Sequence, residues 1–112
     1  MRILYVEDAI EFRRRAVSRH LHDAEVLEVS TVQSALMIVT GGDVAFDAVL
    51  LDYELPDGTG LEVLHALRAA APGVRIIAVS ADRSYNRRLV DAGADGAVLK
   101  SKFHQLRGTL GL

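Results

Sequence analysis

The sequence contains no cysteine and no tryptophan, and only 2 of its 112 residues are proline. The absence of cysteine excludes disulfide bonds, thiolate nucleophiles and cysteine-ligated zinc. Neither sign of charge dominates, because 13 lysines and arginines face 15 acidic residues and the formal net charge is −2. A chain this close to neutral has no global field that would attract nucleic acid or an anionic membrane. We therefore expect a cytoplasmic protein that recognises its partners locally, with no direct nucleic-acid contact and no membrane binding.

Long hydrophobic runs are missing as well. The first apolar run, at residues 3–6, stops at Glu7 and Asp8. It is far shorter than a secretory signal or the ~20 apolar residues that cross a bilayer. Half of all residues are apolar, which at this length is enough for one hydrophobic core. The sequence therefore predicts one domain over residues 1–112, and we expect a monomer or a weak dimer.

Five short apolar segments of β character alternate with helical patterns along the chain. Because these segments are apolar on both faces, we expect strands covered on each side and joined in parallel by helical crossovers. The resulting βα unit, repeated five times, predicts a single doubly wound, flavodoxin-like (βα)5 domain of the α/β class, with the parallel sheet order 2-1-3-4-5. The predicted strands are residues 3–6, 25–29, 48–51, 74–79 and 97–99.

The helical segments differ in how clearly their ends are marked. Residues 32–39 have apolar side chains at helical spacing, and Ser30 and Gln33 have the spacing of a capping box. Residues 63–71 carry a second apolar stripe, which Pro72 and Gly73 follow as stop signals. The remaining helices are less regular, and they are expected at residues 12–21, 84–92 and 103–110.

Polar side chains stand where four of the five strands end. Glu7 and Asp8 follow the first strand, Asp52 the third, Ser80 the fourth and Lys100 the fifth. In a doubly wound sheet, ligands bind outside the carboxyl ends of the strands, where the strand order reverses. These four strands are neighbours in the expected order, so we expect the five side chains to meet at one edge of the sheet.

The composition of this edge indicates phosphoryl-group chemistry. Three carboxylates repel one another and the ammonium of Lys100 cannot neutralise them all, so a further cation is expected. Mg2+ fits, because it prefers oxygen ligands and usually takes one or two carboxylates while keeping waters and phosphate oxygens. Asp52 beside such an ion is a candidate nucleophile toward phosphorus, with Lys100 and Ser80 holding the oxygens of the transferring group.

Four fragments in this order carry a family resemblance: ILYVED at 3–8, LLDYELPDGTGLEVL at 50–64, AVSA at 78–81 and GADGAVLK at 93–100. Together they resemble the receiver domains of two-component response regulators, over essentially the whole chain. The resemblance implies a phosphoacceptor that takes a phosphoryl group from a histidine kinase, a phosphotransfer protein or a small acyl phosphate, with Mg2+, and then switches conformation. It implies slow self-catalysed phosphorylation and dephosphorylation at most, rather than an enzyme, and an unidentified downstream protein partner.

The same resemblance implies a role for each residue at the sheet edge. Asp52 matches the phosphoacceptor, Ser80 the switch hydroxyl and Lys100 the lysine of the family. The implied magnesium ligands are Asp8, Asp52 and the backbone carbonyl of Glu54, with Glu7 acting largely through water.

Three departures from the family pattern lie between Ser80 and Ser101. Ala97 stands where the family usually has an aromatic residue whose rotamer reports phosphorylation. Ser101 stands where the family usually has proline, often after a cis peptide bond. The span from Ser80 to Gly93 is also a couple of residues shorter than is typical. We therefore expect unusual partner contacts on the face formed by the fourth helix, the fifth strand and the fifth helix.

Two acidic neighbours suggest how the lifetime of a phosphoryl group is set. Glu54 and Asp82 lie two residues beyond Asp52 and Ser80. Side chains at these positions would flank an attacking water, so we hypothesise that they tune self-hydrolysis.

Two other functions remain open from the residues alone. Ala97 and Ser101 suit a divergent receiver-like interaction domain that is never phosphorylated. A phosphatase with an aspartyl nucleophile would use Asp52 followed by Glu54, although such enzymes need a cap for which this short chain has no room.

Several further features are expected to be structural. Residues 57–60 predict a turn into the third helix, because the chain has no GxxxxGK[ST] or GxGxxG pattern. Tyr5 is expected in the core with a bonded hydroxyl, and Tyr53 is expected to pack beside Asp52. The arginines of the first helix predict either a solvated face or a kinase-docking surface: Arg13, Arg14, Arg15 and Arg19.

Overall fold

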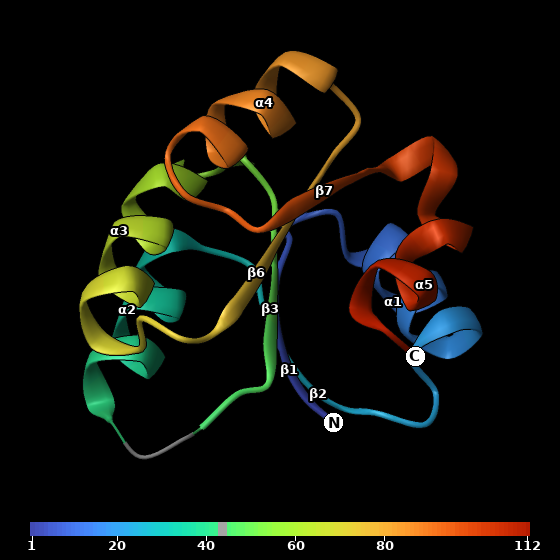
Figure 1. Cartoon of the computed structure of the whole chain (residues 1–112), viewed down its shortest axis with the longest axis horizontal. Helices are drawn as coiled ribbons and strands as arrows, with labels where there is room; N and C mark the ends of the chain where they lie inside the picture. The colour runs from blue at the N-terminus through green and yellow to red at the C-terminus, as the bar shows by residue number, and fades with distance from the viewer. Residues whose placement is uncertain (43–44) are drawn as a thin grey trace.

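A parallel sheet forms the middle layer of the fold and separates two layers of helices (Figure 1). The computed structural model describes residues 1–42 and 45–112. Across the sheet the strands are β2 (Glu25–Val29), β1 (Arg2–Val6), β3 (Ala48–Leu51), β6 (Arg75–Ser80) and β7 (Gly96–Leu99). This is the predicted 2-1-3-4-5 order, since β4 (Glu54–Leu55) and β5 (Gly58–Thr59) form a separate two-stranded hairpin.

The helices cover both faces of the sheet, as the doubly apolar central strands predict (Figure 1). The expectation was wrong for the edge strand β2, whose residues are all exposed or half-buried. One layer contains α1 (Ile10–His20), the 3-10 helix η1 (Lys100–Gln105) and α5 (Leu106–Leu110), and the other contains α2 (Val32–Gly41), α3 (Gly60–Ala70) and α4 (Arg83–Asp91). Alternate residues of each central strand belong to opposite core clusters: in β1, Ile3 and Tyr5 pack on the α1 side and Leu4 and Val6 on the α2 side. Within the described residues, every helix is too short or too polar to cross a bilayer.

Helix α2 begins one residue later than the predicted capping box requires. Its N-cap is Thr31, whose Oγ1 accepts a hydrogen bond from the Ser34 amide at 3.0 Å, so the assignment to Ser30 and Gln33 was wrong. The hydroxyl of Ser30 instead accepts a bond from Arg13 Nη1 at 3.0 Å. The helix ends at Gly41, and its C-cap is Gly42, whose φ of 73° is a left-handed conformation that glycine adopts without strain.

The segment between β3 and α3 is a turn, as predicted, with the β4–β5 hairpin built into it. Asp57 at its tip accepts hydrogen bonds from the amides of Val32 at 2.8 Å and Gln33 at 2.9 Å. These bonds satisfy two free amides of the α2 N-terminus and hold the pKa of Asp57 below its ordinary value. The turn after Asp52 is therefore anchored to the neighbouring helix.

Candidate functional site

The three predicted carboxylates meet at the carboxyl end of the sheet. Glu7 and Asp8 follow β1, and Asp52 follows the adjacent β3. Among the described residues these side chains form an acidic cluster in which one carboxylate oxygen of each lies within 4.8 Å of the others. The set offers only oxygen atoms, which are the ligands that a hard divalent cation such as Mg2+ takes.

The members of this cluster differ in their access to solvent. Glu7 is fully buried and Asp52 is 5% exposed, whereas Asp8 is exposed. Burial raises the pKa of Glu7 to about 7, against the opposing effect of a bond to Lys100 and with a further contribution from the charge of Asp52. The Glu7 carboxyl therefore exchanges between its ionised and its protonated form near neutral pH.

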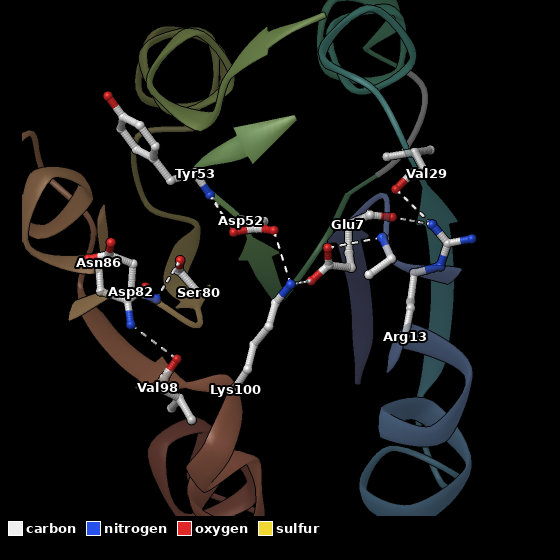
Figure 2. A network of polar contacts seen from close by, with 11 residues as sticks. Glu7, Arg13, Val29, Asp52, Tyr53, Ser80, Asp82, Asn86, Val98 and Lys100 are labelled. Atoms are coloured by element: carbon white, nitrogen blue, oxygen red, sulfur yellow. Dashed lines mark hydrogen bonds and ion pairs between the residues drawn. The ribbon is translucent and has the colours of Figure 1, made fainter. Parts of the chain in front are cut away.

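Lys100 joins the cluster from the first residue of η1. Its Nζ lies 2.6 Å from Glu7 Oε1 and 3.2 Å from Asp52 Oδ2 (Figure 2). Burial alone would lower the pKa of Lys100, but the hydrogen bond to Glu7 and the charges of Glu7 and Asp52 outweigh it and raise the pKa. The ammonium therefore stays charged and bridges the two carboxylates.

The backbone around Asp52 fixes its carboxylate at the end of β3. The Asp52 amide donates to the Val6 carbonyl at 3.1 Å, and Asp52 Oδ1 accepts from the Tyr53 amide at 2.8 Å (Figure 2). Gly60, the first residue of α3, comes so close that a Cβ atom there would lie 2.2 Å from the Asp52 carbonyl oxygen. Only glycine therefore allows α3 to begin against the backbone of Asp52.

Ser80 connects this edge to the start of α4. It ends β6 with 4% exposure, and its Oγ accepts a bond from the Asp82 amide at 3.2 Å (Figure 2). Asp82 is the N-cap of α4, where its Oδ1 accepts bonds from the amide and hydroxyl of Ser84 at 2.7 and 2.6 Å. An open pocket brings these residues together with the acidic cluster, and its lining includes Asp8, Asp52, Glu54, Ser80, Asp82 and Lys100.

Residues 3–110 of the chain match the model of a protein family, the response regulator receiver domain. The chain belongs to this family. It is 38% identical to the two-component response regulator ORR42 of Oryza sativa subsp. japonica, a match over 98% of this chain and 84% of that protein. It is 31% identical to a protein-glutamate methylesterase/protein-glutamine glutaminase of Caulobacter vibrioides, over 96% of this chain but 32% of that protein. Because the match covers only about a third of that longer relative, it gives no reason to assign the relative's enzyme activities to this chain.

Solved receiver structures share the fold across nearly the whole chain. The response regulator TrrA of Thermotoga maritima, in complex with Mg2+ and BeF, superposes with a TM-score of 0.86 at 28% identity and covers 98% of this chain and 96% of its own. The receiver domain of the sensor histidine kinase PA1611 of Pseudomonas aeruginosa, with a magnesium ion in its active-site cleft, gives 0.82 at 25% identity over 97% and 93%. This chain is thus a receiver domain of the two-component type, with the flavodoxin-like fold.

The receiver lacks an aromatic residue on β7, and Ala97 there is exposed. The peptide bonds of residues 1–42 and 45–112 include no cis bond, so the turn after Lys100 forms with Ser101 in the trans form.

Aromatic side chains gather between Asp52 and α4 rather than on β7. The rings of Tyr53 and Tyr85 stack with centroids 4.6 Å apart, and Arg88 lies over both rings and donates to the Tyr53 hydroxyl at 3.2 Å.

A buried amide also connects α4 to β7. Asn86 is 5% exposed, and its Nδ2 donates to the Val98 carbonyl at 3.2 Å (Figure 2). Its Oδ1 has no hydrogen-bond partner in the described part of the chain. The sequence reading did not single out Asn86, although its place three residues before the buried Leu89 marks the apolar face of α4.

Arg13 corrects the expectation of a fully solvated arginine face on α1. Its Nε pairs with Glu28 at 2.8 Å, and its Nη1 donates to the carbonyls of Glu7 and Val29 (Figure 2). The guanidinium therefore links the ends of β1 and β2, and one of its bonds is to the backbone of Glu7 in the acidic cluster. Arg14, Arg15 and Arg19 are exposed, as predicted.

Tyr5 corrects a second expectation. Its ring is fully buried, as predicted, but its hydroxyl has no hydrogen-bond partner among residues 1–42 and 45–112. Burial raises the pKa of this phenol, and the negative charges of Glu7 and Asp52 raise it further. The hydroxyl is unpaired because Tyr5 points into the apolar layer between the sheet and Phe103, where its ring stacks.

Proposed function

We propose that this receiver domain, as one domain over residues 1–112, accepts a phosphoryl group on Asp52 in the presence of Mg2+ and changes conformation around α4. The observation that supports this most directly is the placement of Asp52. Its carboxylate is nearly buried at the edge of the sheet, between the Tyr53 amide and the ammonium of Lys100, and within the acidic cluster.

The donor set fits Mg2+. In our proposal the ion is held by Asp8, Asp52 and the carbonyl of Glu54, while Glu7 acts largely through water. The contacts of Glu7 favour that division, because its Oε1 is already paired with Lys100 and its Oε2 accepts from the Ala9 amide at 3.2 Å. When bound, Mg2+ would neutralise the charge that gathers between the carboxylates and the phosphoryl oxygens.

The chain's own groups then position the transfer. A carboxylate oxygen of Asp52 forms the new bond to phosphorus, and the bond from phosphorus to the donor nitrogen or acyl oxygen breaks, with its electron pair leaving on the donor. Lys100 and Ser80 hold oxygens of the transferring group. Charge stabilisation and alignment carry most of phosphoryl-transfer catalysis, so the Asp52 nucleophile, which is already a carboxylate, needs no general base.

The resulting signal would reach α4 through Ser80. If the Ser80 hydroxyl turns toward the phosphoryl group, its bond from the Asp82 amide is lost and the N-cap of α4 loosens. The stacked rings of Tyr53 and Tyr85 would carry the same movement, because Tyr53 is also bonded to Asp52 through its amide. This route would replace the aromatic readout that Ala97 lacks, and it favours an atypical downstream partner surface.

The donor in this proposal is a histidine kinase or a phosphotransfer protein in the cytoplasm, and the receiver itself is a monomer or a weak dimer. Arg14, Arg15 and Arg19 give α1 an exposed basic surface on the same side of the molecule as Lys100. That surface suits docking of an acidic partner. Slow loss of the phosphoryl group to water would be the only turnover.

A mass measurement tests this function. The protein is incubated with acetyl phosphate, with and without Mg2+, and its intact mass is recorded. We expect a gain of one phosphoryl group that disappears in Asp52→Asn and in the presence of chelator. An unchanged mass with Mg2+ would favour the interaction domain that is never phosphorylated, and repeated turnover of phosphomonoesters would favour the phosphatase.

A further inference from the structure

An aromatic ring lies against the ammonium of Lys100. The Nζ atom is 5.1 Å from the centroid of the Phe12 ring. The same ammonium reaches Glu7 at 2.6 Å and Asp52 at 3.2 Å, and the Lys100 side chain is only 19% exposed. The cation therefore contacts two carboxylates and one π face, and most of the side chain that carries it is shielded from solvent.

The orientation of this ring is set from the core. Phe12 meets Phe103 edge to face, with centroids 5.4 Å apart and planes at 89°. Phe103 in turn stacks on Tyr5 with planes at 7°, and both Phe103 and Tyr5 are buried. Phe12 thus ends an aromatic row that runs from β1 through η1 to α1, and it cannot turn away from Lys100 without disturbing that row.

A π face suits this position beside Lys100 better than a further carboxylate would. The negative face of a ring attracts an ammonium most strongly where water is excluded. The ring carries no net charge, so it adds nothing to the repulsion among Glu7, Asp8 and Asp52 and does not compete for a divalent cation. The attraction acts over the whole ring face. The ammonium can therefore shift from Glu7 toward an incoming phosphoryl oxygen and still lie against the ring.

We propose that Phe12 is a positioning residue for Lys100, whose ammonium its π face holds between Glu7 and Asp52 in readiness for the phosphoryl group. This inference rests on the proposed function of Asp52. It assigns to α1 a part in the phosphoryl transfer that is separate from the docking of a donor protein.

Fluorinated phenylalanine at position 12 tests this role, because each added fluorine weakens the π face and changes the shape of the ring little. Mono-, di- and trifluorinated rings are incorporated at this single site, and phosphorylation by acetyl phosphate with Mg2+ is followed by intact mass. We expect the rate to fall with each fluorine, by about three- to tenfold overall, at nearly constant unfolding midpoint. The same series at Phe46, which lies beneath Arg2 at 5.9 Å far from the acidic cluster, should leave the rate unchanged.

A second measurement needs neither Mg2+ nor phosphorylation. In the metal-free protein, the ring current of Phe12 should shift the NMR signals of the Lys100 ε-methylene group upfield. The shift should persist in Phe12→Tyr and vanish in Phe12→Leu, which keeps most of the apolar volume.

The outcomes separate the inference from the function on which it rests. A wild-type protein that is phosphorylated, together with a flat rate across the fluorinated series, would mean that Phe12 only packs against its neighbours, and the inference falls alone. Lys100 signals that do not respond to Phe12→Leu would overturn it as well. A wild-type protein that gains no phosphoryl group overturns the proposed function and the inference together.

Discussion

The carboxyl edge of the sheet has two halves that are built by different physical means. One half contains the proposed phosphoacceptor, and we call it the phosphoacceptor half: Glu7, Asp8, Asp52 and Lys100. It is held by charge, with ion pairs of 2.6 and 3.2 Å across three strand ends. The α4 half, Ser80, Asp82, Tyr85, Asn86 and Arg88, is held by a helix cap, a ring stack and a buried amide. The first half matches the family pattern, and the second lies where the sequence departs from it.

This difference separates chemistry from transmission. Phosphoryl transfer demands particular charges at particular places, so we expect the phosphoacceptor half to tolerate few other residues. Transmission demands only that two packed arrangements differ in energy, and many side chains satisfy that. In the proposed route, the stack of Tyr53 on Tyr85 would supply such packing in a receiver whose β7 carries Ala97. Substitutions that perturb one half at a time test whether the two halves are separable.

Removal of the ammonium should produce the largest effect. In Lys100→Ala, Glu7 and Asp52 lose their shared cation, and we expect phosphorylation by acetyl phosphate to slow by about 100-fold or more. Intact mass over time measures the rate. Lys102→Ala removes an equal charge from an exposed position nearby and should leave the rate within about twofold. Equal losses in the two variants would show that general charge, and not the ion pairs, matters.

A methyl group at Gly60 should disturb the phosphoacceptor half through the backbone. The added Cβ would meet the Asp52 carbonyl at 2.2 Å, and we expect Gly60→Ala to lower the free energy of unfolding by about 2–3 kcal/mol. Gly108→Ala is the matched control, because it lies in α5 with no atom within 4 Å of its Cβ among the described residues. It should stabilise the protein by about 0.5–1 kcal/mol. Urea unfolding of both variants measures whether their free energies of unfolding change in opposite directions.

The two halves should respond to pH in opposite directions. The raised pKa of Glu7, about 7 against an ordinary 4.5, means that the folded protein holds a proton in this window that the unfolded chain has released. Stability of the metal-free protein should therefore fall as pH rises from about 5 to about 8, by about 1–3 kcal/mol. Asp82 has a pKa lowered by its bonds from Ser84, so its contribution is lost only as pH falls below the ordinary aspartate range.

Glu7→Gln isolates the first of these effects. The amide cannot ionise, so the free energy of unfolding should change less between about pH 5 and about pH 8 than it does in the wild type. Urea unfolding at several pH values, with chelator present, measures this. A variant that keeps the wild-type slope would assign the pH dependence to other groups.

Loss of the ring stack should affect transmission and spare the chemistry. In Tyr85→Leu, we expect phosphorylation to proceed within about threefold of the wild-type rate, because the ions around Asp52 are intact. The phosphorylation-dependent change in hydrogen exchange over α4 should be largely lost. Arg87→Ala, an exposed neighbour on the same helix, serves as control. A Tyr85→Leu variant in which α4 still responds fully would remove the stack from the transmission route.

The smallest effect is expected on the phosphoryl lifetime. Glu54 and Asp82 both line the pocket beside Asp52, and replacement of both by alanine should change the dephosphorylation rate by about two- to tenfold. The decay of the phosphorylated mass after removal of acetyl phosphate measures this rate. An unchanged lifetime would show that neither side chain influences the attacking water.

The alternation of apolar strands with helices was enough to predict the parallel sheet and the edge at which the polar side chains gather. Strands that are apolar on both faces and alternate with helices allow one arrangement, a parallel sheet with crossovers, and polar residues at strand ends must then gather at its carboxyl edge. The meeting of Glu7, Asp8, Asp52 and Lys100 follows once the strand order is 2-1-3-4-5, which is one of two common orders of doubly wound sheets. It does not depend on how any helix is rotated about its axis.

Contacts between side chains of different helices and strands could not be predicted, because they depend on how these elements pack in three dimensions. Arg13 is buried because the rotation of α1 directs it to the ends of β1 and β2, where its guanidinium also donates to the Ser30 hydroxyl. The contact of Phe12 with Lys100 depends on the packing of α1 against η1. Such contacts join residues far apart in the chain, and local spacing carries no information about them. The unpaired hydroxyl of Tyr5 has the same origin, since its surroundings come from Phe103 at the other end of the chain.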